Sequence, residues 1–358
     1  MEFGILFTSQ PHKDREPYPH RAVHQRVTDE IIAADRLGFD CAWLAEHHFS
    51  TEYGIMPDVW VYAGHLAALT NRIKLGMAVV TLPLTNPVRT VENAAFVDIL
   101  SAGRVMLGVG SGYRKYEFDG FGVDFEARRD VQEEALEIVL DLLRTGRSTR
   151  NGKHHKVDIS GDYELLPQSL QRPYPPLYLA GATERSIATA GRLGFGLMLS
   201  TLTPFETLAT QVVHYRANLE KASKQARENP AFGHIDVARW VYVAETDAKA
   251  KRESEEGLLR HLKHFFGGHQ VGYLGQTSQG KDSLASGLDY DTLARSTIIH
   301  GSPSTVAARI GELEEKTGLT SLMLHYPPWY GTERAKASLE LFAEEVRPRV
   351  RPPAKTAE

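Results

Sequence analysis

The chain has 358 residues, 42% of them hydrophobic and 24% charged, an ordinary globular composition with enough apolar material for a large core. The 41 Lys and Arg residues against 45 Asp and Glu give a net charge of −4 without a concentrated basic face, so we expect no nucleic-acid partner. The apolar runs are too short to cross a bilayer, so we expect no membrane-spanning segment and no membrane partner. The chain has a single cysteine, Cys41, and therefore cannot form an internal disulfide. The N-terminus lacks a signal-peptide pattern, so we expect a cytoplasmic protein.

Short β-branched runs alternate along the chain with longer amphipathic stretches, which predicts alternating strands and helices. The first half predicts, in order, strand Phe3–Phe7, helix Val23–Leu37, strand Cys41–Ala45, helix Val59–Leu69, strand Ile73–Leu82, helix Val88–Leu100, strand Arg104–Val109 and helix Val131–Leu143. The second half predicts strand Pro176–Ala180, helix Ser186–Leu193, strand Gly196–Ser200, helix Phe205–Lys221, strand Ile235–Ala244, helices Ala248–His264 and Thr305–Lys316, strand Ser321–His325 and helix Arg334–Val346.

Eight strand–helix alternations imply parallel strands joined by right-handed crossovers. At this length they favour an α/β fold of the closed (β/α)8 TIM-barrel type. We expect residues 1–347 to form a single domain and residues 348–358 a C-terminal tail. A doubly wound open sheet is the alternative fold.

Two segments depart from the repeat and are interpreted as insertions after strands 4 and 7. In the first, Thr145–Pro175, the runs Lys156–Ile159 and Tyr163–Leu166 are predicted to form a hairpin. The second, Phe266–His300, is rich in Gly, Ser and Gln and has little periodicity. A loop of this length is either functional, in this case a lid over the active site, or a surface excursion.

Polar residues follow the second strand, where a TIM barrel places its catalytic groups. This stretch is Glu46-His47-His48. A histidine at such a position can act as an acid or a base, and a neighbouring carboxylate can orient its ring. Because side chains alternate along a strand, we expect His47 to face the barrel mouth and Glu46 the other side. The alternative is a pair of hydrogen-bonded histidines without a catalytic role.

Two glycine-rich stretches follow the fourth and fifth strands. The first is Gly110-Ser111-Gly112-Tyr113, which would let the backbone approach a flat or charged group. The second is Gly181-Ala182-Thr183, with Ser186 three residues further on, at the start of a helix. Free amide groups and hydroxyls there suit a phosphate, although ordinary helix capping explains the same residues.

A metal site is a further alternative. His261 and His264 lie three residues apart on a predicted helix, and His269 follows closely. No cysteine or clear acidic cluster joins them, so we expect no metal.

Several of these stretches together resemble the bacterial luciferase-like monooxygenase family. The matching motifs are Phe3-Gly4, Gly38-Phe39-Asp40, Trp43-Leu44, Glu46-His47-His48-Phe49, Glu52-Tyr53-Gly54, Gly76, Leu82-Pro83, Pro87-Val88-Arg89, Gly103-Arg104, Gly108, Phe118 and Gly194 to Ser200. The similarity covers most of residues 1–200 and continues more weakly to about residue 347.

The resemblance implies a TIM barrel that binds FMN at the strand ends. It implies that a separate flavin reductase supplies reduced FMN, which reacts with molecular oxygen to oxidise a small organic substrate. His47 matches the catalytic histidine of the family, and Thr183 and Ser186 match hydroxyls that hold the FMN phosphate. Ala78 and Val79 match a non-prolyl cis peptide under the flavin ring. Family members usually pair through barrel helices, so we expect a homodimer.

The chain also departs from the family pattern. Ser111 stands where luciferase has a phosphate-binding arginine, and Arg114 and Arg185 are the candidates to replace that arginine. Gly110 stands in place of a flavin-facing cysteine. We therefore expect hydroxylation or Baeyer–Villiger oxidation without light emission. The alternatives are a deazaflavin-dependent dehydrogenase on the same fold and a non-catalytic flavin-binding subunit.

Overall fold

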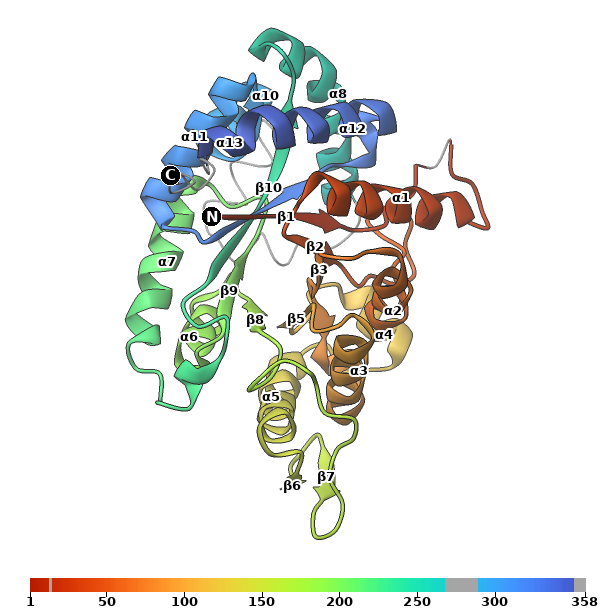
Figure 1. Ribbon diagram of the computed structural model, residues 1–358, viewed down its shortest axis with the longest axis vertical. Helices are drawn as coiled ribbons and strands as arrows, with labels where there is room; N and C mark the ends of the chain where they lie inside the picture. The colour runs from red at the N-terminus through yellow and green to blue at the C-terminus, as the bar shows by residue number, and fades with distance from the viewer. Residues whose placement is uncertain (13–14, 268–288, 351–358) are drawn as a thin grey trace, which may run out of the picture.

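Eight parallel strands close into a barrel in the computed structural model, which describes residues 1–12, 15–267 and 289–350 (Figure 1). Around the barrel the strands are β1 (Glu2–Phe7), β2 (Cys41–Leu44), β3 (Lys74–Met77), β5 (Val105–Gly110), β8 (Leu177–Ala180), β9 (Gly196–Leu199), β10 (Ile235–Val243) and β12 (Ser321–His325). Pairing of β9 with β10 closes the ring. The predicted TIM barrel is confirmed.

Helices between the strands cover the outside of the barrel. They are α1 (Arg21–Leu37), α2 (Val59–Leu69), α3 (Pro87–Leu100), α4 (Lys115–Phe121), α5 (Arg128–Thr145), α6 (Glu184–Leu193), α7 (Phe205–Leu219), α8 (Asp247–Gly267), α10 (Tyr290–Ser296), α11 (Pro303–Thr317), α12 (Thr332–Leu341) and α13 (Arg347–Val350). Within the described ranges, no helix combines the length and apolar character needed to cross a membrane.

Two apolar layers hold the fold together. Alternate strand residues such as Ile5 and Leu75 point outward and are buried beneath the helices, in the larger core. The inward-facing layer includes Trp43 and Tyr178, whose rings meet edge to face at a centroid distance of 5.3 Å. Gly76 makes room for this layer, because a Cβ there would lie 2.3 Å from the Trp43 ring. Close packing against the Trp43 ring therefore explains why a glycine stands at position 76, inside a predicted strand.

The first insertion differs from its prediction. Lys156–Ile159 is strand β7, but its antiparallel partner is β6 (Ser148–Asn151) and not Tyr163–Leu166. β6 also contacts α5, where Arg150 forms ion pairs with Glu137 and Asp141. Local sequence pattern carried no sign of these long-range ion pairs.

Three other boundaries also differ from the predictions. The third strand is split into β3 and the short β4 (Val80–Thr81). The end of the second insertion forms α10 and strand β11 (Ile299–Gly301), which pairs with β10; the rest of the predicted lid, residues 268–288, lies outside the described residues. Helical structure continues to Val350 through a π-helical turn, Phe342–Val346, and therefore enters the segment expected as a tail.

Candidate active site

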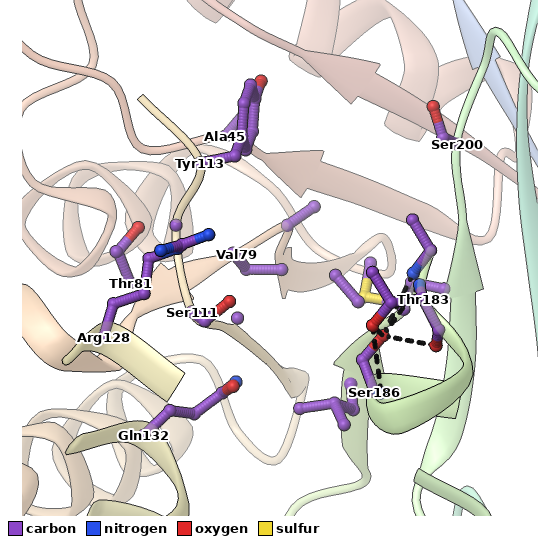
Figure 2. A pocket seen from close by; sticks show the side chains of 18 of the residues that line it. Ala45, Val79, Thr81, Ser111, Tyr113, Arg128, Gln132, Thr183, Ser186 and Ser200 are labelled. Carbon is purple, nitrogen blue, oxygen red and sulfur yellow. Dashed lines mark hydrogen bonds between the residues drawn. The ribbon is translucent and has the colours of Figure 1, made fainter. Parts of the chain in front are cut away.

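A cavity of about 470 Å³ lies at the carboxyl ends of the barrel strands (Figure 2). This volume falls within the usual range for small-molecule sites. Most of the residues predicted from the sequence line it: Glu46, His47, Ala78, Val79, Gly110, Ser111, Gly112, Tyr113, Gly181, Ala182, Thr183 and Ser186. His48 is the one predicted catalytic residue that is not among the described residues lining the cavity.

His47 is held by a carboxylate that the sequence analysis missed. Its Nδ1 lies 3.0 Å from Oε1 of Glu117, which α4 brings to the end of β2, and both side chains are buried. Burial lowers the pKa of His47, and Glu117 opposes this shift. Burial would raise the pKa of Glu117, but its hydrogen bonds with His47 and the His48 amide lower it overall. The pair is therefore a neutral imidazole beside a carboxylate near pH 7.

This geometry fixes the tautomer of His47. An ionised carboxylate can only accept hydrogen bonds, so Nδ1 donates to Glu117 and Nε2 is the basic nitrogen. The amide of His48 also donates to Glu117 Oε1, at 3.0 Å, which anchors the carboxylate to the backbone of the same loop.

Glu46 and His48 form a second pair. His48 Nε2 lies 3.2 Å from Glu46 Oε1, and the His48 ring packs edge to face on Phe121 at 4.8 Å. Burial raises the pKa of Glu46, and His48 opposes this shift. Glu46 is therefore not the partner of His47, as the alternation of side chains along the strand predicted.

Two tyrosines and an arginine form the wall next to His47. The Tyr53 ring meets His47 edge to face at 4.5 Å, and Tyr113 does so at 6.1 Å. The Arg114 guanidinium carbon lies 4.3 Å from the Tyr53 ring centre and 5.0 Å from that of Tyr113. Arg114 therefore stacks on these two rings beside His47.

The Ala78–Val79 segment between β3 and β4, Thr81 of β4 and Gly110 of β5 line the cavity. The Ala78–Val79 peptide bond is cis, as the resemblance implied. Gly110 lies against it, since a Cβ on Gly110 would approach Cγ2 of Val79 to 2.7 Å. A cysteine at position 110 would need this wall to shift, which accounts for the departure noted in the sequence.

The start of α6 forms another part of the wall (Figure 2). Thr183 Oγ1 accepts from the Ser186 amide at 3.3 Å, and Ser186 Oγ accepts from the amides of Thr183 and Ala182 at 3.1 and 3.2 Å. The two hydroxyls lie 3.0 Å apart. The capping interpretation is confirmed, and the same arrangement gathers hydroxyls and amides at the cavity wall.

Helix α5 adds donors that the sequence analysis did not select. Figure 2 shows Arg128 and Gln132 side by side on α5, with Ser111 between them and the start of α6. Arg128 Nε and Gln132 Nε2 are buried without a hydrogen-bond partner in the described part of the chain. Arg185 also lines the cavity but is bound to Glu133 and Asp130. Their spacing of four residues places Arg128 and Gln132 on one helix face, but the predicted helix began only at residue 131.

The predicted metal alternative finds no support where it can be examined. The ring of His261 packs on the ring of Trp240. The side chains of His264 and His269 are not among those that the structure describes. Across residues 1–12, 15–267 and 289–350, no group of three or more His, Cys, Asp or Glu side chains could hold a metal ion.

The luciferase-like monooxygenase family model matches residues 1–321 of the chain. The chain belongs to this family. An uncharacterised protein of Sinorhizobium fredii is 37% identical over 181 residues, which is 51% of this chain and 50% of that protein. Limonene 1,2-monooxygenase of Rhodococcus erythropolis is 27% identical over 355 residues, covering 97% of this chain and 86% of its own.

Solved structures of this luciferase-like monooxygenase fold align over nearly the whole chain. The oxygenating constituent of 3,6-diketocamphane monooxygenase from Pseudomonas putida, solved with FMN, aligns with a TM-score of 0.80 at 21% identity and covers 99% of both chains. The coenzyme F420-dependent tetrahydromethanopterin reductase of Methanopyrus kandleri aligns with a TM-score of 0.71 at 21% identity, covering 98% of this chain and 99% of its own. At this identity the likeness establishes the shared fold.

Proposed function

We propose that this chain is a monooxygenase that uses reduced FMN and molecular oxygen to oxidise a small organic substrate. The observation that carries the proposal is one cavity that holds both the buried His47–Glu117 pair and a cluster of phosphate-type donors. Glycines and the flat Ala78–Val79 segment lie in the same cavity. The family membership and the FMN-containing structural neighbour support this proposal.

The residues present fit an FMN phosphate. Arg128 Nε and Gln132 Nε2 are buried donors with no partner inside the described ranges, and such groups call for a hydrogen-bonding ligand. Thr183 and Ser186 present hydroxyls from a helix N-terminus, where the helix dipole favours an anion. We assign to Arg128 the place of the arginine that the family has at position 111.

The residues near Val79 and Gly110 fit a flat ring. A ring there would lie between the glycine-rich end of β5 and the His47 wall, and when bound reduced it would supply the electrons that activate oxygen. His47 holds or moves a proton at Nε2, while Glu117 fixes its ring orientation and stabilises its protonated form. The rings of Tyr53 and Tyr113 form the wall beside His47 and would orient a substrate next to it.

A deazaflavin-dependent dehydrogenase is the second candidate, favoured by the alignment with a coenzyme F420-dependent reductase. The test is to titrate the full chain with FMN and with F420 while following protein fluorescence. We expect saturable FMN binding and, with the reduced flavin, oxygen uptake. Binding of F420 alone, with hydride transfer and no oxygen uptake, would replace the monooxygenase proposal. Failure to turn over with either cofactor would favour the non-catalytic subunit.

The remaining proposals follow from this function. As the family resemblance implies, a separate flavin reductase would deliver reduced FMN as a transient partner. We also propose that the protein acts in the cytoplasm and as a homodimer. We also propose that the oxidation is dark.

A further inference from the structure

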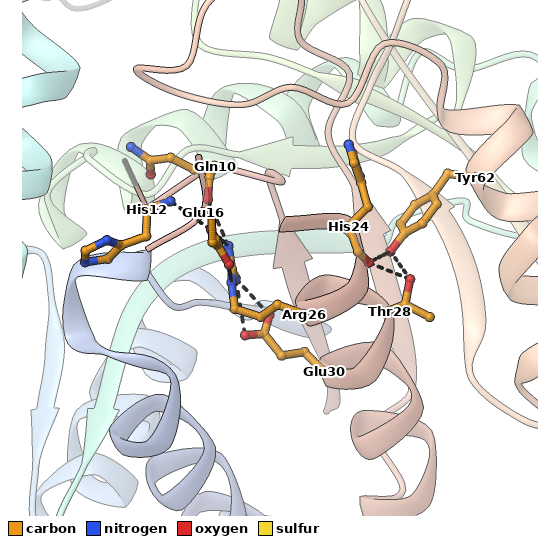
Figure 3. A network of polar contacts seen from close by, with 8 residues as sticks. All are labelled: Gln10, His12, Glu16, His24, Arg26, Thr28, Glu30 and Tyr62. Atoms are coloured by element: carbon orange, nitrogen blue, oxygen red, sulfur yellow. Dashed lines mark hydrogen bonds and ion pairs between the residues drawn. The ribbon is translucent and has the colours of Figure 1, made fainter. Parts of the chain in front are cut away.

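The loop that follows β1 is tied to helix α1 by a network of ion pairs and hydrogen bonds (Figure 3). Arg26 donates from Nε and Nη2 to the two carboxylate oxygens of Glu16, at 2.6 and 3.2 Å, and its Nη1 lies 3.3 Å from Glu30 Oε1. Arg26 Nη2 also donates to the Gln10 carbonyl at 2.9 Å. Glu16 Oε2 in turn accepts from the His12 amide at 2.8 Å. One guanidinium group therefore fixes the backbone of this loop at residue 10 and, through Glu16, at residue 12.

The loop after β1 in turn holds the loop after β2, on both sides of Tyr53. The side-chain amide of Gln10 donates to the Glu52 carbonyl at 2.8 Å. The Ile55 amide donates to the Ser9 carbonyl at 3.2 Å. Both Gln10 and Ser9 are buried, so water competes little for these two hydrogen bonds. Tyr53 therefore stands on a stretch of backbone that is held at residues 52 and 55.

Close packing between the two loops leaves this stretch little freedom to move. A Cβ on Gly54 would lie 2.1 Å from the Thr8 carbonyl oxygen, so the backbones of the two loops touch directly at this point. The loop after β2 also closes on itself, because the His47 amide donates to the Met56 carbonyl at 2.9 Å. The position of Tyr53 is therefore set by both loops together.

Tyr53 connects this arrangement to the candidate active site. Its side chain lines the cavity, and its ring meets the His47 ring edge to face at a centroid distance of 4.5 Å. The Arg114 guanidinium carbon lies 4.3 Å from the centre of the Tyr53 ring. Burial is the main cause that lowers the pKa of His47, and the Tyr53 ring is one of the groups that cover it. Displacement of Tyr53 would therefore expose His47 to water and raise its pKa.

We propose that Gln10 is a positioning residue for His47: it holds the Glu52 carbonyl and thereby the Tyr53 ring, and Arg26 anchors it to α1. Gln10 is not among the described residues that line the cavity, so it acts on His47 through Tyr53. This assignment rests on the proposed role of His47 in proton transfer. It adds to that role a residue from the neighbouring strand–helix unit of the barrel.

The titratable side chains around His47 come from the loop after β2, from α4 and from the segment between β5 and α4. They are Tyr53, His48, Glu117, Tyr113 and Arg114. Burial, Arg114 and His48 lower the pKa of His47, whereas Glu117 raises it. Glutamine and methionine are both uncharged, so Gln10→Met alters the pKa of His47 by changing the packing and hydration of its ring and adds no charge.

The test places 3-fluorotyrosine at position 53 of the full chain and follows its ¹⁹F resonance between pH 4 and 8 without added flavin. Because the two rings are in contact, protonation of His47 should move this resonance, and the midpoint of the titration gives the pKa of His47. In the otherwise native chain we expect one narrow resonance and a midpoint below 6.5. Gln10→Met removes the donor at similar side-chain length. It should broaden the resonance and raise the midpoint towards 6.5, by about 0.5 or more.

Two further variants make the test specific. Gln10→Asn keeps the amide but is one methylene shorter, so it should act like Gln10→Met, and it decides the question if that variant does not fold. Thr28→Val is the matched control, because Thr28 lies on the same helix and its hydroxyl is bonded at 2.7 Å to both the His24 carbonyl and the Tyr62 hydroxyl, away from the loop after β1 (Figure 3). Thr28→Val should leave the line width and the midpoint unchanged.

Three results would overturn the positioning role of Gln10. They are an unchanged resonance and midpoint in the folded Gln10 variants, a midpoint that falls, and an equal change in Thr28→Val. The titration needs neither flavin nor substrate, so its outcome does not depend on whether the chain is a monooxygenase. Failure of the proposed function would instead appear in FMN binding and oxygen uptake.

Discussion

His47 is the residue to which the proposed chemistry assigns the proton. His47→Ala should lower turnover by about 10²–10⁴-fold, the usual contribution of a positioned acid–base group. FMN affinity should change little, because the phosphate donors lie on α5 and α6. His48→Gln is the matched control and should have a smaller effect, since His48 binds Glu46 and packs on Phe121. Full turnover in His47→Ala would make His47 a structural residue.

Glu117 makes a separate prediction about pH. Its charge raises the pKa of His47, whereas burial, Arg114 and His48 lower it. Glu117→Gln removes that charge, so the pKa of His47 should fall further. The acid limb of the pH–turnover profile, where His47 becomes protonated, should then move to lower pH. An acid limb that stays in place or moves upward would show that Glu117 does not act through His47.

Asp236 predicts a pH dependence of stability. It is fully buried on β10, and burial raises its pKa to about 7 from 3.8. A raised pKa means that its contribution to stability is complete below about pH 4 and is lost as pH rises to about 7. The free energy of unfolding of Asp236→Asn relative to that of the native chain should therefore increase from pH 5 to pH 8, by roughly 4 kcal/mol at most. Urea unfolding of the variant and of the native chain at pH 5 and at pH 8 measures this change. If the two proteins differ in stability by the same amount at both pH values, the prediction is wrong.

The sequence was informative for some of these residues and silent for others. His47 was found because it directly follows a strand, where barrel enzymes place catalytic groups. Glu117 is 70 residues away, on a short helix that the periodicity did not predict, so no local pattern joined the two. The hydrogen bond from Gln10 to the Glu52 carbonyl likewise joins two loops 42 residues apart, which sequence spacing alone does not connect.

At the scale of single elements, the start of α6 should contribute both to FMN binding and to the stability of the helix, and the two contributions can be measured separately. Replacing Thr183 and Ser186 together by Ala should weaken FMN binding by about 1–3 kcal/mol, through lost hydrogen bonds to a charged group. It should also cost about 1 kcal/mol of stability, because Thr183 is the helix cap. Riboflavin, which lacks the phosphate, is the control ligand. An equal loss of riboflavin affinity would place the phosphate elsewhere.

The predicted boundaries of helices and strands agree best with the structure where a single local sequence signal determines the boundary. Helix ends marked by Gly38 and Gly194 were predictable, since both glycines adopt the left-handed conformation that ends a helix. The partner of β7 was not predictable, because β6 is short and polar and carries no apolar alternation that marks it as a strand. Alternation along a half-exposed hairpin does not distinguish such partners.

At the scale of the whole molecule, α2 and α3 leave apolar side chains exposed. Val61 and Phe96 are 73% and 54% exposed, and Leu69, Ile99 and Leu100 add to the same two neighbouring helices. Such a surface is typical of an interface, and it supports the proposed homodimer. Sedimentation should give a dimer at micromolar concentration, and Phe96→Glu with Leu100→Glu should give a monomer. A native chain that sediments as a monomer contradicts the dimer.

The most direct measurement for the whole enzyme is the fate of labelled oxygen. Reduced FMN bound to the full chain is mixed with ¹⁸O₂ and a panel of small ketones, aldehydes and alkenes, and the products are examined by mass spectrometry. We predict that one ¹⁸O atom enters an organic product in the native chain and that His47→Ala loses this incorporation while still binding FMN. Recovery of all the consumed oxygen as hydrogen peroxide with every substrate, or substrate oxidation that needs no oxygen, would contradict a monooxygenase.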